Sequence, residues 1–500
     1  MFIFVIDCIK NNKLIKIMLK NLTSNNTLKL VISTLVTYVT FSCTASKNTD
    51  SSFPLNEMMK IEKTIQEPKF KNATYNIVNY GAKPDGITFC TDSFKKAIEE
   101  CNKNGGGKVI VPFGKYLTGA IHLEDNVNLH LEDGAEIIFS TNPKDYPIVH
   151  TSFEGIELMN YSPLIYAYQK KNIAITGKGI LNGQGNNENW WPWKGSTSEG
   201  NEYGYTKGNP SQQDLENLPR LMDMSEKNVP LEKRIFGDGH YLRPNFIEPF
   251  ECENVLIKDV KIINAPFWII HPMKSKNVIV DGVHIASHGP NNDGCDPEYS
   301  KNVLIKNSIF NTGDDCIAIK AGRDAEGRRV GITTENIIVR DCKMIDGHGG
   351  VVIGSEMSAG VKNVFAYNCY MDSPNLDRAI RLKTNTKRGG FVDGLYVKNI
   401  TVGQVKEALL HITMKYSVYG NQTGDFIPKI KNIYMENITV KDAGKYVIFA
   451  DGLENSKIEN ITLKNIKIDK VKDEFKINNI KNLKITESYI KDKKIITPQN

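Results

Sequence analysis

The sequence lacks the features that are typical of several large protein classes. Its nine cysteines form no CxxC pair, which argues against a structural zinc site. No segment is rich enough in Lys and Arg to indicate binding to nucleic acid, and the formal net charge is only +6. The hydrophobic content of 40% and the charged content of 24% are ordinary for a soluble globular protein. The mild positive charge is still compatible with a polyanionic partner.

The N-terminal segment contains an apolar run that is too short to span a bilayer. The run covers residues 30–41 and is typical of the core of a signal peptide. It ends with a small residue before Cys43, which resembles a bacterial lipoprotein cleavage site. We therefore expect residues 1–43 to be a leader, Cys43 to be lipidated and residues 44–67 to form a flexible tether. The alternative is plain secretion with cleavage nearby. Both interpretations predict an exported protein, in the outer membrane, in the periplasm or at the cell surface.

A short strand that opens with Asn and an apolar residue recurs along the chain, most regularly in its central block. A period mostly in the twenties, with several short strands per repeat, indicates a solenoid whose coils stack on one another. We therefore predict an all-β fold, a right-handed parallel β-helix. The alternative solenoid, a leucine-rich repeat, is disfavoured because its Leu framework is missing. The copies begin at Asn172, Asn254, Asn277, Asn302, Asn336, Asn363, Asn432, Asn460 and Asn482.

Two segments depart from this repeat. Residues 93–102 have apolar positions at helical spacing, and we expect a short helix that caps the open N-terminal end of the solenoid. Residues 187–246 are rich in Gly, Pro, Asn and charged residues. We interpret them as an inserted loop within a single domain that covers residues 68–490.

The repeat register brings charged residues to one face. Asp314 follows Asn302 at the same distance in sequence at which His348 follows Asn336. Equal offsets predict that Asp314 and His348 stack on successive coils, about 4.8 Å apart. Asp293 precedes Asp314 by close to one coil. The same surface is expected to collect three further residues: Asp315, Arg381 and Lys383.

Such a cluster has a chemical rather than a structural explanation. Taken singly, an Asp next to Gly is usually a turn residue, and a His between glycines is usually a loop residue. Stacked like charges repel one another, so a solenoid gains no stability from collecting them. Crowding also raises the pKa of one carboxyl group, as a general acid requires near neutral pH. We therefore predict an acid–base catalytic site on this face.

The motifs around these residues resemble those of a known enzyme family. Four of them, in this order, are similar to the signature motifs of the polygalacturonase family of glycoside hydrolases: Asn291-Asn-Asp, Gly313-Asp-Asp, Gly347-His-Gly and Arg381-Leu-Lys. Two longer stretches resemble its exo-acting members: Asn264-Ala-Pro-Phe-Trp and Gly354-Ser-Glu-Met. Asn292 stands where Thr is common and Leu382 where Ile is common. Neither departure changes a catalytic atom.

The resemblance implies hydrolysis of α-1,4-galacturonosyl linkages in pectin, with inversion at the anomeric carbon. Asp314 would be the general acid, and Asp293 and Asp315 would hold and deprotonate the attacking water. His348 would keep the acid in its proper ionisation state. No metal and no organic cofactor are implied, and we expect a monomer. The residues implied to bind the substrate are Arg381, Lys383, Tyr416 and Asn291.

The mode of action is predicted from the insertions. A large insertion beside an open groove would block one end, which favours an exo-acting enzyme. Three of the four Trp residues lie in the insertion at positions 190, 191 and 193, either to stack on sugar rings or to anchor the loop. An Arg-rich segment, residues 322–329, either binds the carboxylate of a terminal sugar or is a solvated turn.

Several alternatives stay open. Carboxylates on adjacent rungs are closer than is usual for inverting enzymes, so spacing alone would favour retention. Rhamnogalacturonan or xylogalacturonan could be the backbone that is cleaved, although two cations at the site favour a uronic acid at the cleavage point. A pectate lyase would use calcium and a base. A non-catalytic glycan-binding β-helix would have no need of the three aspartates.

Overall fold

The computed structural model describes residues 53–196, 202–417 and 423–498. The predicted leader and Cys43 lie outside the described residues, so lipidation of Cys43 stays a prediction. Within the described ranges, no helix is both long and apolar enough to cross a membrane.

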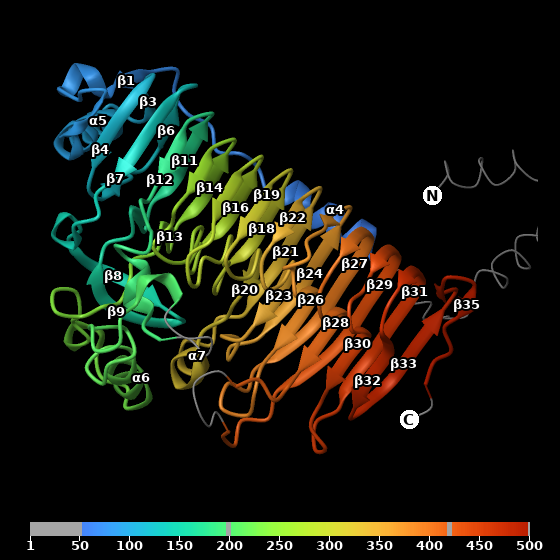
Figure 1. Ribbon diagram of the computed structural model, residues 1–500. Coiled ribbons are helices and arrows are strands. Elements are labelled where there is room, and N and C mark those ends of the chain that lie inside the picture. Colours follow the sequence, from blue (N-terminus) through green and yellow to red (C-terminus); the bar gives the residue numbers. More distant parts are fainter. Residues whose placement is uncertain (1–52, 197–201, 418–422, 499–500) are drawn as a thin grey trace, which may run out of the picture. The chain divides into compact units, whose positions relative to one another are not determined.

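The described chain winds into a parallel β-helix, as predicted (Figure 1). Coils contribute strands to a long first sheet and to a second sheet. One series of strands in the first sheet is β3 (Gly107–Val111), β6 (Val127–Leu131), β11 (Lys171–Gly177), β14 (Glu253–Lys258), β16 (Lys276–Asp281), β18 (Lys301–Lys306), β21 (Thr334–Arg340), β24 (Val361–Tyr367), β27 (Phe391–Gln404), β29 (Lys429–Asp442), β31 (Ile458–Lys470) and β33 (Ile480–Thr486). The other series is β4 (Gly114–Thr118), β7 (Ala135–Phe139), β12 (Ile180–Asn182), β15 (Lys261–Ile263), β17 (His284–Ser287), β19 (Ile309–Thr312), β22 (Lys343–Asp346) and β25 (Tyr370–Met371).

The second sheet carries the candidate site. Isolated bridges through Ile270 and Cys295 connect β13 (Ile247–Phe250) with β20 (Ile317–Ile319) and so join the two parts of this sheet. Along β26, Ile380 and Leu382 belong to the interior core, so the alternating Arg381 and Lys383 face outward. We call this outward surface the site face. Its strands are β5 (Ile121–His122), β10 (Ile165–Tyr168), β13 (Ile247–Phe250), β20 (Ile317–Ile319), β23 (Val351–Gly354), β26 (Arg378–Lys383), β28 (Ala408–Thr413), β30 (Tyr446–Asp451) and β32 (Asp473–Asn478).

The recurring Asn has a local structural cause. Asn277 and Asn302 have φ angles of 55° and 58°, in the left-handed region that Asn tolerates better than most residues. The side-chain amide of Asn302 donates to Asn277 at 3.2 Å, and that of Asn336 donates to Asn302 at 3.0 Å. The repeat therefore marks a ladder of Asn side chains. The register of β16, β18 and β21 follows the spacing of the repeat in the sequence, since Val303 lies opposite Val278 and Ile337.

Helices cover two parts of the solenoid. The helix α5 (Thr91–Lys103) packs against the first coil, where a capping helix was predicted. The prediction of a flexible tether over residues 44–67 was wrong for its described part. There the helix α4 (Leu55–Thr64) lies along the outside of the first sheet, with Phe53 and Met58 buried (Figure 1). The cause is an apolar stripe on the outward side of the sheet: Ala174, Leu256, Ile279, Leu304, Ile338 and Phe365.

The segment between β12 and β13 is irregular, with the short helix α6 (Leu218–Glu226) as its longest element. It packs against a feature that the sequence did not reveal, an antiparallel hairpin of β8 (Ile148–Phe153) and β9 (Ile156–Tyr161). Together they bury a second apolar core: Phe153, Ile156, Leu158, Leu218, Leu221, Phe236, Leu242, Phe267 and Trp268. Trp190 is only 1% exposed, so it anchors the insertion and is not available to stack on a sugar.

Within the described ranges, the remaining elements lie at the two ends of the solenoid, in its turns or in the insertion. They are β1 (Thr74–Asn76), β2 (Asp85–Phe89), α7 (Asp324–Val330), β34 (Tyr489–Ile490), β35 (Lys493–Lys494), and five 3-10 turns at residues 77–80, 143–145, 191–194, 202–204 and 231–233.

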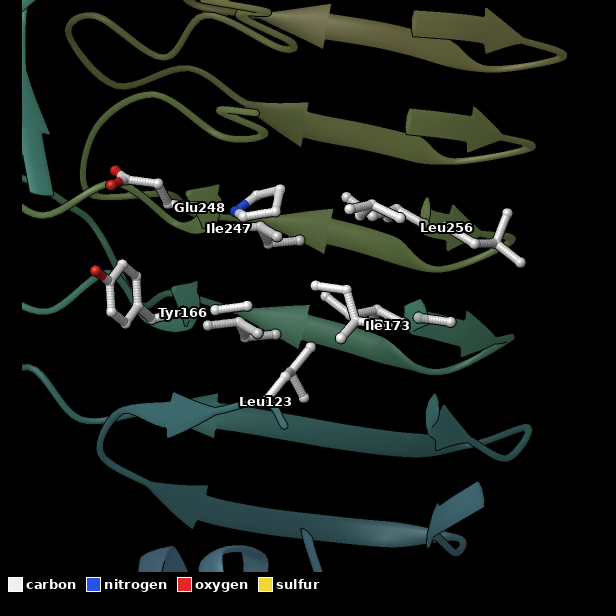
Figure 2. A pocket seen from close by; sticks show the side chains of 13 residues that line it. Leu123, Tyr166, Ile173, Ile247, Glu248 and Leu256 are labelled. Carbon is white, nitrogen blue, oxygen red and sulfur yellow. The ribbon is translucent and has the colours of Figure 1, made fainter. Parts of the chain in front are cut away.

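One void lies inside the solenoid between the two sheets (Figure 2). Leu123, Ile173, Ile247 and Leu256 line it, so its wall is almost entirely apolar. It holds a water-sized volume of only about 10 Å³, near the minimum for one water molecule. A void of this size and polarity is a packing gap and not a binding site.

Candidate active site

Three aspartates meet where the chain enters the second sheet. Asp314 and Asp315 lie in the turn between β19 and β20, and Asp293 lies in the equivalent turn one coil earlier. The backbone links the two turns, because the N–H of Gly294 donates to the carbonyl of Asp315 at 3.0 Å. Carboxylate oxygens of the three residues all lie within 4.8 Å of one another. This spacing could hold a cation, but the neighbouring ammonium and guanidinium groups already supply positive charge.

His348 stacks on Asp314 from the next coil. Its Nδ1 lies 3.0 Å from Oδ1 of Asp314, and its backbone N–H donates to the carbonyl of Asp314 at 3.2 Å. The charge of Asp314 and the hydrogen bond at Nδ1 raise the pKa of His348 to about 9, although its imidazole is about half exposed. Burial alone would raise the pKa of Asp314, but the imidazolium outweighs it and holds that pKa well below its usual range. The free pair is therefore ionic.

A second buried layer adjoins Asp293. The carboxyl of Asp296 is fully buried, and neither oxygen has a hydrogen-bond partner among the described residues. The ammonium of Lys320 lies 3.5 Å from the carboxylates of both Asp293 and Asp296 and 3.3 Å from Glu356. Burial and the charge of Asp314 raise the pKa of Asp293 to about 7, although Lys320 opposes them. Of Asp293 and Asp314, it is thus Asp293 whose pKa rises, and not Asp314, the implied acid. Burial and the charge of Asp293 also raise the pKa of Asp296.

Two cations lie on the other side of the cluster. Nζ of Lys383 donates to Oδ2 of Asp315 at 2.6 Å, and a guanidinium nitrogen of Arg381 lies 3.4 Å from Oδ1. The ring centre of Tyr416 lies 5.4 Å from the Lys383 ammonium and 5.6 Å from the Arg381 guanidinium carbon. Burial would lower the pKa of both cations, but Asp315 raises it, so both stay charged. These groups form one end of the charged cluster.

The insertion holds the loop that carries Asp293. Arg243 donates to the carbonyl of Pro290 at 2.6 Å and to the side-chain oxygen of Asn291 at 2.8 Å. The side-chain oxygen of Asn292 accepts from Ser287 at 2.6 Å and from the backbone of Gly289 at 2.8 Å. Asn291, implied as a substrate-binding residue, is therefore engaged through its oxygen by the insertion.

Neighbouring groups contact the arginines of the Arg-rich segment, although Arg329 stays exposed. Arg323 is 1% exposed and pairs with Glu154 of the hairpin at 2.6 Å. Arg328 lies over the ring of Phe426, and Arg329 pairs with Glu326 at 3.0 Å. The segment forms the short helix α7. It contacts the hairpin through Arg323, the insertion through Arg329, which donates to the carbonyl of Ser225, and the loop after β28 through Arg328.

Lys320 and Asp296 were missed from the sequence, although a signal for Lys320 existed. Ile317-Ala-Ile-Lys320 and Ile380-Arg-Leu-Lys383 have the same alternation. Register places both lysines in one outward column, because Lys320 and Lys383 flank Gly354 on neighbouring coils. The equivalence of the two strands would have indicated that Lys320 faces the site.

The site is closed on one side and open on the other. Along one outward column of the site face, Glu248, His271 and Asp296 are fully buried. The stacked rings of Phe267 and Trp268, with centres 5.2 Å apart, belong to the apolar core that covers this end. Figure 1 shows β8, β9 and α6 beside the N-terminal half of the solenoid, away from β28, β30 and β32. The site face is therefore covered on the side of the N-terminal coils and accessible on the side of the C-terminal coils.

Buried carboxylates in contact with an imidazole and two cations, on a parallel β-helix, define an acid–base glycoside hydrolase. The family "Glycosyl hydrolases family 28" matches residues 236–488, just over half of the 500 residues. The chain belongs to this family.

Similar proteins agree with this assignment. The chain is 42% identical to an exopolygalacturonase from Thermotoga maritima of known structure, with a TM-score of 0.79 over 87% of this chain and 96% of that one. It is 29% identical to an exo-poly-α-D-galacturonosidase from Dickeya chrysanthemi, over 74% of this chain and 62% of that protein. It is 26% identical to a probable polygalacturonase from Vitis vinifera, over 79% of this chain and 74% of that protein.

Proposed function

We propose that the protein hydrolyses α-1,4-galacturonosyl linkages of pectin from a chain end, with inversion. The observation that carries this proposal is the contact of Arg381 and Lys383 with the aspartate cluster through Asp315. Two cations at this point suit a substrate with a carboxylate beside the bond that is cleaved. The names of the similar proteins support the same substrate and mode.

The proposed roles follow from the ionic contacts. Asp315 forms ion pairs with Arg381 and Lys383. This environment is suited to the proposed role, in which Asp315 and Asp293 orient and deprotonate the attacking water. Asp314 is the proposed acid, and the proton of its pair with His348 resides on the imidazole in the free enzyme. Donation to the glycosidic oxygen then requires that proton to cross the 3.0 Å hydrogen bond to Oδ1 of Asp314. His348 supplies the proton, and Asp314 delivers it.

The covered part of the site face, on the side of the N-terminal coils, supports exo action. A chain cannot run past Glu248 and His271, because the hairpin and the insertion bury that part of the site face. A sugar bound on this side is the last of its chain, whereas the open side accommodates the remainder.

The test is an incubation of the purified protein with de-esterified polygalacturonan, with early products resolved by size. Galacturonate or one short oligomer from the outset supports exo-hydrolysis, and a ladder of oligomers contradicts it. Unsaturated products, or loss of activity with a chelator, would indicate a lyase instead. A folded protein without any product would make rhamnogalacturonan or a decorated pectin the next substrate to test. Proton NMR of the first product should show the β-anomer, as inversion requires.

We also propose that the protein is exported, anchored through lipidated Cys43, and monomeric. Cell fractionation after labelling with a fatty acid tests the anchor, with Cys43→Ser as the variant that should lose the label. Size measurement of the purified protein tests the monomer.

We expect the activity to depend on pH through two groups. Asp293 must be ionised to act as a base, so kcat/KM should rise as the pH increases through about 7. The pair of His348 and Asp314 must hold one proton, so kcat/KM should fall as the pH increases through about 9. In His348→Gln only Asp314 can hold that proton, and the alkaline limb should move down by about two pH units or more. An unchanged alkaline limb would exclude His348 from the proton route.

A further inference from the structure

The site face continues past the catalytic cluster on the open side. One outward column runs from Arg381 through His411 and Phe449 to Lys476, because each residue lies opposite the next in the register of β26, β28, β30 and β32. Three rungs of about 4.8 Å each separate Arg381 from Lys476. Unlike Glu248 and His271 in the same column, His411 and Phe449 are only half-buried, and Lys476 is exposed.

These side chains contact one another as an ordered surface. The rings of His411 and Phe449 stack with centres 4.3 Å apart and an angle of 5° between their planes. The ammonium of Lys476 lies 5.2 Å from the centre of the Phe449 ring. Burial, then the nearby Arg378 and Arg381, lower the pKa of His411 to about 3, so its ring is neutral. An uncharged, stacked aromatic pair therefore lies between two cations along the column, Arg381 and Lys476.

The aromatic pair and the cations of this column have the chemistry to bind a polyanionic sugar chain. The two rings stack face to face, so their outward edges offer the apolar contact to a sugar chain, and a cation attracts its carboxylates. Within the described ranges Lys476 makes no ion pair, whereas the neighbouring Lys415 is paired with Asp451 at 2.7 Å. Packing of the solenoid does not require this arrangement, because the core is formed by the alternate, inward side chains of the same strands, such as Leu410 and Ile448.

We propose that His411, Phe449 and Lys476 form a binding track for the part of a polyuronate chain that extends beyond the cleaved bond. The proposal rests on the proposed function and adds to it that the enzyme prefers long chains. Each added sugar on the open side gains contacts until the chain passes β32, the last strand of the second sheet.

The test compares kcat/KM on polygalacturonate with kcat/KM on digalacturonate for the wild type, Phe449→Ala and Lys476→Glu. In each variant the ratio of the two values should fall roughly three- to tenfold. The loss in Lys476→Glu should shrink at high salt, because an exposed charge is screened. Matched controls are Tyr489→Ala and Lys467→Glu, which change exposed residues on the first sheet and should keep the wild-type ratio.

The possible failures can be told apart. If the wild type hydrolyses both substrates and both variants keep its ratio, the track is overturned while the hydrolase assignment stands. If the folded wild type releases galacturonate from neither substrate, the proposed function fails and the track fails with it. Lys476 is exposed, so Lys476→Glu carries the test if Phe449→Ala unfolds.

Discussion

Replacement of Asp314 by Asn should lower kcat by about 10³-fold, within the usual contribution of general acid–base catalysis. The amide cannot pass a proton to the leaving oxygen, and it also removes the charge that holds the proton on His348. Asn has nearly the same size as Asp, so the turn between β19 and β20 should keep its structure. Initial rates on polygalacturonate measure the effect, and calorimetric titration with trigalacturonate should show that binding survives.

A matched control is Asp259→Asn. Asp259 is an exposed residue with a φ of 64°, a conformation in which Asn is at least as favourable, and it lies in a turn of the first sheet. This variant should retain the wild-type rate. If Asp314→Asn kept more than about a tenth of the activity, the acid would be another carboxyl, and Asp293 with its raised pKa would be the first alternative. Binding without turnover in the wild type itself would support a glycan-binding protein.

The repeat made most of this arrangement predictable. Asp314 and His348 have the same offset from the Asn that opens their repeats, which required the two side chains to stack, and they lie 3.0 Å apart. The same register requires Asp293 to reach the cluster from one coil earlier. A solenoid converts a distance in sequence into a position in space, so the contact between these side chains could be inferred without coordinates.

Features without a repeat could not be inferred in this way. The hairpin of β8 and β9 and the helix α4 have no periodic partner, and only burial of a matching apolar surface places them. The ionisation states of the aspartates could not be predicted from the sequence either. Crowding of the carboxylates predicts that the pKa of one of them rises. Which of Asp293 and Asp314 it is depends on an imidazole 3.0 Å from Asp314 and an ammonium 3.5 Å from Asp293. The register assigns each residue to a coil, but it does not determine distances between side-chain atoms.

Replacement of Lys383 by Met should lower both stability and activity. Lys383 makes the shorter of the two ion pairs of Asp315, at 2.6 Å, and Asp315 is fully buried. Met has a similar length without the charge, so the carboxylate keeps only Arg381 at 3.4 Å. Loss of one partner of a buried ion pair lowers the free energy of unfolding by about 3 kcal/mol. The kcat/KM on polygalacturonate should fall by about 10²-fold, because a substrate carboxylate also loses its cation.

Thermal unfolding and initial rates separate the two effects when Asp315→Asn is added to Lys383→Met. The double variant should regain only part of the lost stability, since the neutral Asn needs no counter-charge but the buried Arg381 loses its ion pair with Asp315, and it should stay inactive. Lys398→Met serves as the control, because it breaks a partly exposed ion pair with Glu436 on the first sheet and should cost less than about 1 kcal/mol. A Lys383→Met protein as stable as the wild type would mean that Arg381 alone neutralises Asp315. In that case Lys383 would serve the substrate and not the fold.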